Sequence, residues 1–179
     1  MEILKFPNLK LRERSKQIDL KDTKEQSQII KLVQEMQCTM YEANGIGLAA
    51  PQVGILKQLF IIDIEQTVEK DDDGEVVSRT PGILMVFINP EIKSKTGEVV
   101  YEEGCLSVPG IYEDVKRAEK VELEYYDLNF EKKHLAVDGF LAVVIQHEYD
   151  HLEGKLFIDK LSIVKRAIVK NKILKGKNL

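Results

Sequence analysis

Two of the three histidines in this 179-residue chain flank a glutamate in the sequence His147-Glu148-Tyr149-Asp150-His151. On a helix, side chains four residues apart leave the same face about one turn apart, so both imidazoles can bind one metal ion. Glu148 would then lie beside the metal, where it can carry protons to and from a metal-bound water. The spacing therefore predicts a divalent metal site with hydrolytic chemistry.

A metal held by two histidines needs at least one more protein ligand. Cys105 is the strongest candidate, because a thiolate binds soft or borderline divalent metals well and Gly104 before it permits close approach. Two imidazoles and one thiolate leave a fourth tetrahedral position for water, as in catalytic sites. His134 is the alternative ligand, but it follows a run of charged residues on a predicted surface strand, where an exposed histidine is expected.

Small residues fill a third segment, Gly45-Ile46-Gly47-Leu48-Ala49-Ala50-Pro51-Gln52. Its glycines and alanines would let the backbone of a substrate lie close to the protein. A helix cap followed by a packed turn explains the same residues. This segment therefore supports no function when it is taken alone.

A helix is predicted over residues 23–43, ahead of the glycine-containing segment. Thr23 and Gln26 fit a capping box, in which both side chains satisfy free backbone groups. Asn44-Gly45 would end the helix. Cys38 lies within it, and we expect an ordinary buried apolar side chain there. Apolar residues recur at intervals of four, three and four: Ile29, Val33, Met36 and Met40.

Short strands are predicted in the middle of the chain. Residues 59–62 and 83–88 are apolar runs typical of buried strands. The polar residues 65–82 between them contain Asp71-Asp72-Asp73-Gly74 and indicate a solvated loop or hairpin. Residues 121–125 alternate between apolar and polar, and a turn at 127–129 would lead into a return strand over 130–137.

The order of these elements indicates an α+β fold. Asp138 would cap the helix that carries the H-E-x-x-H sequence, and Gly154 would end it. We expect antiparallel or mixed β-sheets around this central helix, with further helices near the N-terminus and the C-terminus. Residues 1–179 would form a single domain, in which residues 160–179 are a basic C-terminal helix.

Composition narrows the class of protein. A hydrophobic content of 44% and a charged content of 31% are normal for a globular protein. No apolar run approaches the ~20 residues needed to span a bilayer, and the N-terminus does not resemble a signal peptide. Two cysteines do not make a disulfide framework. We therefore expect a cytoplasmic protein with neither a membrane nor DNA as a partner.

Charge is unevenly distributed along the chain. Seven of the 26 Lys and Arg residues follow Asp159, where there is no acidic residue, so the first 159 residues carry 19 basic against 30 acidic side chains. Leu161, Val164 and Ile168, with Ile163 and Ala167, follow helical spacing and predict the packed face of a terminal helix. A solvated lysine face explains the charge as well as docking to ribosomal RNA does, so both interpretations stay open.

Together the three segments resemble those of the peptide deformylases, and the similarity covers nearly the whole chain. The shared motifs are residues 45–52, Glu103-Gly104-Cys105-Leu106-Ser107 and Gln146-His147-Glu148-Tyr149-Asp150-His151. H-E-x-x-H alone also marks many zinc proteases, whereas all three motifs in this order are highly specific. The resemblance implies a bacterial hydrolase that removes the formyl group from the N-terminal methionine of new polypeptides and releases formate.

The resemblance also implies the metal and the chemical step. Fe²⁺ would be the usual ion, and Zn²⁺, Ni²⁺ or Co²⁺ would be able to occupy the same ligands, Cys105, His147 and His151. Metal-bound hydroxide would attack the formyl carbon. Glu148 would accept the water proton and deliver it to the departing amine, as general base and then general acid.

Substrate contacts follow from the same resemblance. The Gln52 side-chain amide and the Leu106 backbone N–H would donate to the formyl oxygen as negative charge develops on it. Gly47 would lie beside the substrate backbone. The methionine pocket would be lined by Ile46, Val143 and Val144, although ordinary helix core also explains the two valines.

Two rival functions are weaker. A zinc peptidase would cleave internal peptide bonds and take its third ligand from His or Glu, whereas Cys105 and Gln52 favour a deformylase. A non-catalytic metal-binding or ribosome-associated relative would have lost Glu148 or a ligand, and all of them are present.

Two features depart from the family pattern. Residues 65–82 are longer and more acidic than in compact members, and Tyr112 replaces a basic residue of some relatives.

Overall fold

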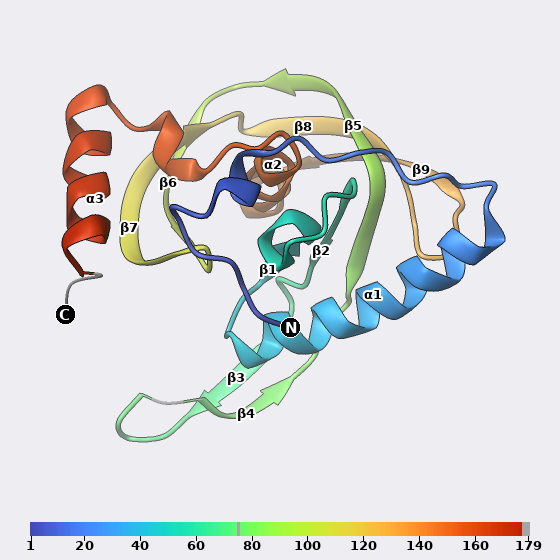
Figure 1. Cartoon of the computed structure of the whole chain (residues 1–179), viewed down its shortest axis with the longest axis horizontal. Helices are drawn as coiled ribbons and strands as arrows, with labels where there is room; N and C mark the ends of the chain where they lie inside the picture. The colour runs from blue at the N-terminus through green and yellow to red at the C-terminus, as the bar shows by residue number, and fades with distance from the viewer. Residues whose placement is uncertain (75, 177–179) are drawn as a thin grey trace.

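The H-E-x-x-H helix lies at the centre of the fold, with strands around it (Figure 1). The computed structural model describes residues 1–74 and 76–176. The central helix is α2, Gly139–Leu152. Asp138 occupies its N-cap position but makes no side-chain cap hydrogen bond, so the predicted position is right and the predicted bond is absent. Gly154 ends the helix as expected, with a φ of +68° and its N–H donating to the His151 carbonyl oxygen.

The strands of the described residues form three antiparallel sheets, which with the helices confirms the predicted α+β class. The largest has five strands in the order β1 (Gly47–Ala49), β2 (Leu59–Ile62), β5 (Met85–Thr96), β8 (Lys120–Tyr126) and β9 (Lys132–Asp138). Two hairpins complete the set: β3 (Thr67–Lys70) with β4 (Val76–Thr80), and β6 (Val99–Cys105) with β7 (Val108–Arg117). Single-turn 3₁₀ helices cover Leu9–Arg12, Ala50–Val53 and Phe157–Lys160.

Most of the predicted strands are present, and one is longer than expected. The strand over 59–62 matches β2, and residues 65–82 contain the β3–β4 hairpin. The strand predicted over 83–88 begins at Met85 and continues to Thr96, because its outer half pairs with β8. The turn at 127–129 is confirmed by the Phe130 N–H, which donates to the Asp127 carbonyl oxygen at 2.9 Å.

Helix α2 is fixed by apolar packing on one side of the five-stranded sheet. Ala142 and Ile145 are fully buried against Phe60, Phe87 and Leu123. Helix α1 (Thr23–Glu42) packs separately, and its predicted apolar stripe is buried, with at most 1% of each side chain exposed. The H-E-x-x-H residues therefore extend from an element that is held firmly in the interior.

Two details of α1 differ from the sequence prediction. Its N-cap is Asp22, whose carboxylate accepts from the Lys24 N–H at 2.8 Å, whereas Thr23 is already helical. The Gln26 amide donates to the Leu20 carbonyl oxygen instead of closing a capping box. An aspartate caps better than a threonine and also favours the positive end of the helix dipole. Cys38 is exposed, not buried, because it lies off the apolar stripe.

The C-terminal helix α3 (Ile163–Gly176) turns a different face inward from the one predicted. Leu161, just before the helix, is buried as predicted. Within the helix, however, Val169 is buried and Ile173 packs with it, whereas Ile163, Val164 and Ile168 are 83%, 68% and 62% exposed. The helix is apolar on two faces, and periodicity cannot say which one packs. No described helix is long and apolar enough to cross a membrane.

Candidate active site

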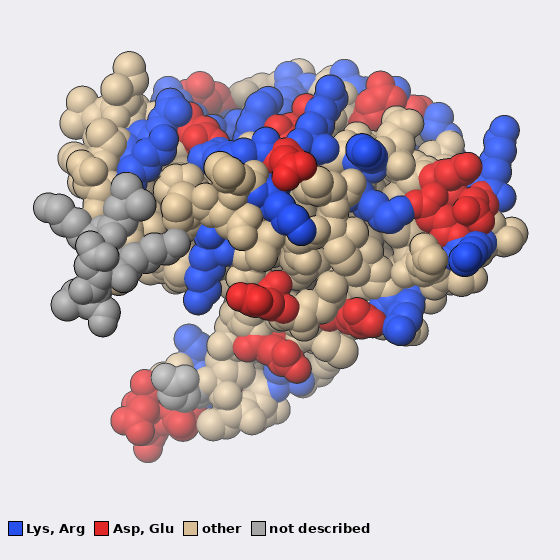
Figure 2. All heavy atoms as spheres, in the orientation of Figure 1, with Lys and Arg blue, Asp and Glu red and all other residues tan. Residues whose placement is uncertain are grey.

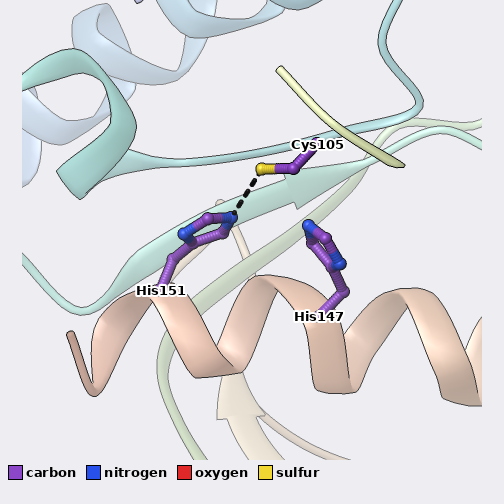
Figure 3. A group of neighbouring side chains, drawn as sticks. All are labelled: Cys105, His147 and His151. Atoms are coloured by element: carbon purple, nitrogen blue, oxygen red, sulfur yellow. Dashed lines mark hydrogen bonds between the residues drawn. The ribbon is translucent and has the colours of Figure 1, made fainter. Parts of the chain in front are cut away.

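Cys105, His147 and His151 come together at the end of β6 and on one face of α2, as Figure 3 shows. The Cys105 Sγ lies 3.4 Å from the His151 Nε2. One ligand atom from each of the three residues lies within 4.8 Å of the others. His134, the alternative ligand, is exposed on β9, and within residues 1–74 and 76–176 it is not part of this group.

This geometry fits a divalent metal. Tetrahedral Zn–S and Zn–N bonds of about 2.3 and 2.0 Å place neighbouring donor atoms roughly 3.5 Å apart. The observed sulfur-to-nitrogen distance of 3.4 Å matches that separation. One thiolate with two imidazoles suits borderline metals such as Zn²⁺ and Fe²⁺ and does not suit Mg²⁺ or Ca²⁺, which require oxygen ligands.

A buried charge cluster orients His147. The His147 Nδ1 lies 2.8 Å from the Glu103 Oε2, so its Nε2 is left for a metal. Arg117 holds Glu103 through two parallel hydrogen bonds of 2.7 and 2.8 Å, and it also binds the Asp150 carboxylate. Burial favours the protonated form of Glu103, but hydrogen bonds from Arg117 and His147 outweigh it and lower the pKa of Glu103 to about 2. Glu103 is therefore a fixed anion behind the metal site.

Glu148 lies on α2 with His147, and its carboxyl group lies beside Gly47. It is 4% exposed, and its Oε2 has no hydrogen-bond partner among the described residues. Burial raises the pKa of Glu148 to about 7. A buried carboxyl group that is poised near neutrality is suited to exchanging protons with a substrate or a water.

Gly47 leaves the space that Glu148 occupies. A Cβ atom at position 47 would lie 2.5 Å from the Glu148 Oε1, so any side chain there would force this carboxyl group to move. From the sequence, Gly47 was expected only beside the substrate backbone. The two residues are far apart in the sequence, so only the fold shows that glycine at position 47 leaves room for the Glu148 carboxyl group.

Gln52 points its amide group toward Cys105. Its side chain is buried, and its Oε1 accepts from the Ala49 N–H at 2.7 Å. That bond fixes the Nε2 as the group that faces inward, 3.6 Å from the Cys105 Sγ and 3.3 Å from the Ser107 Oγ. Leu106, the next predicted donor, directly follows Cys105 and lines the same cavity.

A cavity of about 470 Å³ opens onto these groups. All four predicted substrate residues, Ile46, Gly47, Val143 and Val144, line it. Further apolar wall residues were not predicted, because only the fold gathers them; among them are Tyr101, Val108, Ile111 and Phe140. Tyr112, singled out above only as a departure from the family pattern, also lines the cavity. The rings of Tyr101 and Phe140 lie 5.8 Å apart between centroids and form an aromatic part of the wall.

An H-E-x-x-H helix among antiparallel sheets, with a cysteine beside its two histidines at the end of a neighbouring strand, is typical of a class of metal-dependent hydrolases. Within that class, the family model for polypeptide deformylase matches residues 1–167. The chain belongs to this family. It is therefore a metal-dependent hydrolase that removes the N-formyl group from newly synthesised polypeptides.

Individual relatives agree with the family match. The chain is 47% identical to peptide deformylase 2 of Xanthomonas axonopodis pv. citri over 162 residues, which cover 90% of this chain and 87% of that protein. The solved structure of a peptide deformylase from Legionella pneumophila is 40% identical, with a TM-score of 0.80 over 99% of this chain and 95% of that one. A peptide deformylase from Synechococcus elongatus in complex with actinonin is 38% identical, with a TM-score of 0.81 over 98% and 88% of the two chains.

Proposed function

We propose that Cys105, His147 and His151 hold an Fe²⁺ ion in this deformylase, and that Glu148 moves the protons of the reaction. The convergence of one sulfur and two imidazoles beside a buried carboxyl group carries the proposal. When bound, the metal supplies an activated water at neutral pH. The choice of Fe²⁺ follows the family resemblance, and the same donor atoms suit Zn²⁺, Ni²⁺ and Co²⁺.

Glu148 accepts the proton of the attacking water and returns it to the nitrogen of the departing peptide. Its Oε2 is buried and has no hydrogen-bond partner among residues 1–74 and 76–176, so it is available to hold that proton. The Oε1 packs against Gly47 on the opposite side. One carboxyl group therefore serves as base and then as acid without changing position.

Gln52 and Leu106 stabilise the charge that develops on the formyl oxygen. The Gln52 Nε2 faces the metal site because its Oε1 is already bonded to the backbone. The Leu106 backbone N–H is the second donor of this proposed oxyanion hole. Donors that are fixed before the reaction cost no reorganisation during it.

The formyl-methionine lies in the 470 Å³ cavity. Gly47 follows the substrate backbone, and Ile46, Val143 and Val144 line the slot for the thioether side chain. Val143 and Val144 are nearly buried and yet line the cavity, so they act as core and as wall at the same time. An unbranched thioether suits an apolar slot of this kind.

We further propose that α3 docks on the ribosome, which would place the enzyme in the bacterial cytoplasm near emerging chains. One face of α3 packs through Val169, whereas Ile163, Val164 and Ile168 are exposed among basic residues. Lys165 already pairs with Glu113 at 2.7 Å, so Lys170 and Lys172 are the candidates for RNA phosphates. The side chain of Lys175 and all of Lys177 lie outside the described residues.

Formate release tests the chemical proposal directly. The enzyme is purified without oxygen, its metal content is measured, and turnover of a formyl-Met peptide is compared with cleavage of casein. Formate release with about one Fe²⁺ per chain is expected, since iron and thiolate are both sensitive to oxidation. Casein cleavage without formate release would instead identify a peptidase.

Ribosome docking needs a separate test. The double variant Lys170→Glu/Lys172→Glu should bind the ribosome with lower affinity, and that affinity should change less steeply with salt concentration. Turnover of small peptides should stay unchanged. Equal ribosome affinity in the double variant and the wild type would eliminate docking through this helix.

A further inference from the structure

The segment Asn44–Gly47 forms one edge of the cavity and links α1 to β1. Asn44 adopts a left-handed conformation with a φ of +57°, and the Gly45 N–H donates to the Met40 carbonyl oxygen at 2.8 Å. These two residues set the direction in which the chain leaves α1. They therefore fix where Ile46 and Gly47 lie relative to a bound peptide.

Two side chains from outside the cavity hold this edge. The Gln66 Nε2 donates to the Gly45 carbonyl oxygen at 2.8 Å and to the Asp63 carbonyl oxygen at 2.9 Å. Arg79, on β4, donates to the Asn44 Oδ1 at 2.5 Å and also to the Gln66 Oε1. One guanidinium group thus joins Asn44 to the amide that holds Gly45.

Further contacts support Asp63, the residue beneath Gln66. Asp63 is fully buried, and its Oδ2 accepts from the Tyr41 hydroxyl at 2.6 Å. The Asp63 backbone N–H donates to the Ile46 carbonyl oxygen at 2.9 Å. The Arg79 guanidinium lies 5.8 Å from the centroid of the Tyr41 ring. Three consecutive residues of the edge are therefore held by Asp63 and Gln66, which lie between β2 and β3, and by Arg79 on β4.

We propose that Arg79 and Gln66 are positioning residues that set the affinity of the enzyme for formyl-Met peptides. This inference rests on the proposed function, because it requires Ile46 and Gly47 to contact the peptide. Neither Arg79 nor Gln66 is among the described residues that line the cavity, so each acts through Asn44 and Gly45. The tip of the hairpin stands away from the body of the protein in Figures 1 and 2, and only its base makes these contacts.

Arg79→Met in the metal-loaded enzyme is the main test. We expect KM for a formyl-Met peptide to rise by about threefold to tenfold, the range expected from losing hydrogen bonds that a charged group donates near the surface. We expect kcat to stay within about twofold, since the metal ligands and Glu148 are untouched. Arg14→Met is the matched control, because Arg14 is an exposed arginine that pairs with Glu153 on another part of the surface.

A second variant separates positioning from a loss of folding. Gln66→Ala removes the same link from the other end, and Val77→Ala alters an exposed side chain on the same strand as Arg79. If Arg79 acts through Gln66, the double variant that combines Arg79→Met with Gln66→Ala should raise KM no more than the stronger of the two single variants does. Val77→Ala should leave KM and the melting temperature unchanged.

Three results would overturn the inference: an unchanged KM in both Arg79→Met and Gln66→Ala, a fall in kcat alone, or fully additive effects in the double variant. Wild-type turnover measured alongside keeps the proposed function separate. If the wild-type enzyme releases formate and the variants keep its KM, the positioning role fails while the deformylase mechanism stands.

Discussion

Two arginines support different parts of the wall of the same cavity, and they do so by different means. Arg117 is buried behind α2, with 2% of its side chain exposed, and it binds the carboxylates of Glu103 and Asp150. Arg79 is only half-buried at the base of a hairpin, and it binds the amide oxygens of Gln66 and Asn44. The α2 side, which carries the proposed catalytic residues, is fixed by buried ion pairs. The 44–47 segment, which is proposed to contact the peptide, is held by hydrogen bonds closer to the solvent.

This contrast predicts where the protein tolerates change. Leaving buried charges without their partner is far more costly than losing a hydrogen bond near the surface. Substitutions on the α2 side should therefore affect chemistry or folding, and substitutions on the hairpin side should affect peptide affinity.

The largest expected effect is on the α2 side. Glu148→Ala should lower kcat by at least about 10²-fold to 10⁴-fold, because it removes the group that moves both protons. Metal content and melting temperature should remain close to the wild-type values. Near-normal formate release by this variant would remove Glu148 from the mechanism.

Gly47→Ala tests a point where the 44–47 segment meets α2. The new methyl group would lie 2.5 Å from the Glu148 Oε1 and must displace that carboxyl group. Since a catalytic group moved by 1 Å can cost about 10²-fold in rate, kcat should fall by roughly that factor. Single-turnover kinetics would show whether the chemical step is slowed. A variant that changes only KM would assign Gly47 to substrate contact alone.

Arg117→Met should reduce stability instead. Glu103 would then keep only His147 as a partner and Asp150 only Lys160, 3.2 Å away, and breaking such a buried cluster costs about 3–5 kcal/mol of unfolding free energy. Urea denaturation measures this loss, and Arg79→Met gives the comparison on the side of the 44–47 segment. Equal destabilisation by the two substitutions would contradict the distinction drawn between them.

The smallest expected effect concerns a third arginine, Arg12, which binds Asp159 outside the cavity. Burial favours protonation of Asp159, but the hydrogen bond from Arg12 outweighs it and lowers the pKa of this carboxyl group. The stability gained is present above the unfolded pKa of about 3.9 and is lost as the pH falls below it. Asp159→Asn should cost less than about 1 kcal/mol near neutral pH and nothing in strong acid, as measured by denaturation at several pH values.

Local patterns were enough to predict which three side chains come together as candidate metal ligands, and most of the elements. The four-residue spacing of His147 and His151 follows from helix geometry, and the chemistry of a thiolate singled out Cys105. The apolar stripe of α1 was equally readable. These features depend on neighbours in the sequence or on the properties of single residues.

The features that were missed depend on how elements meet. Arg117 binds carboxylates 14 and 33 residues away, and no local pattern records such a cluster. The two apolar faces of α3 look alike in the sequence, and only packing through Val169 selects one of them. Cys38 was misplaced because a helical residue can face outward as readily as inward.

The central position of α2 has a consequence for motion. A helix enclosed by sheets exchanges its amide hydrogens only when much of the molecule opens, whereas a hairpin attached at its base exchanges through small local openings. Hydrogen exchange should therefore be slowest near Ile145 and fastest in β3 and β4. The enzyme would then accommodate different nascent chains through small movements of the β3–β4 hairpin, while the proposed catalytic groups on α2 keep their positions.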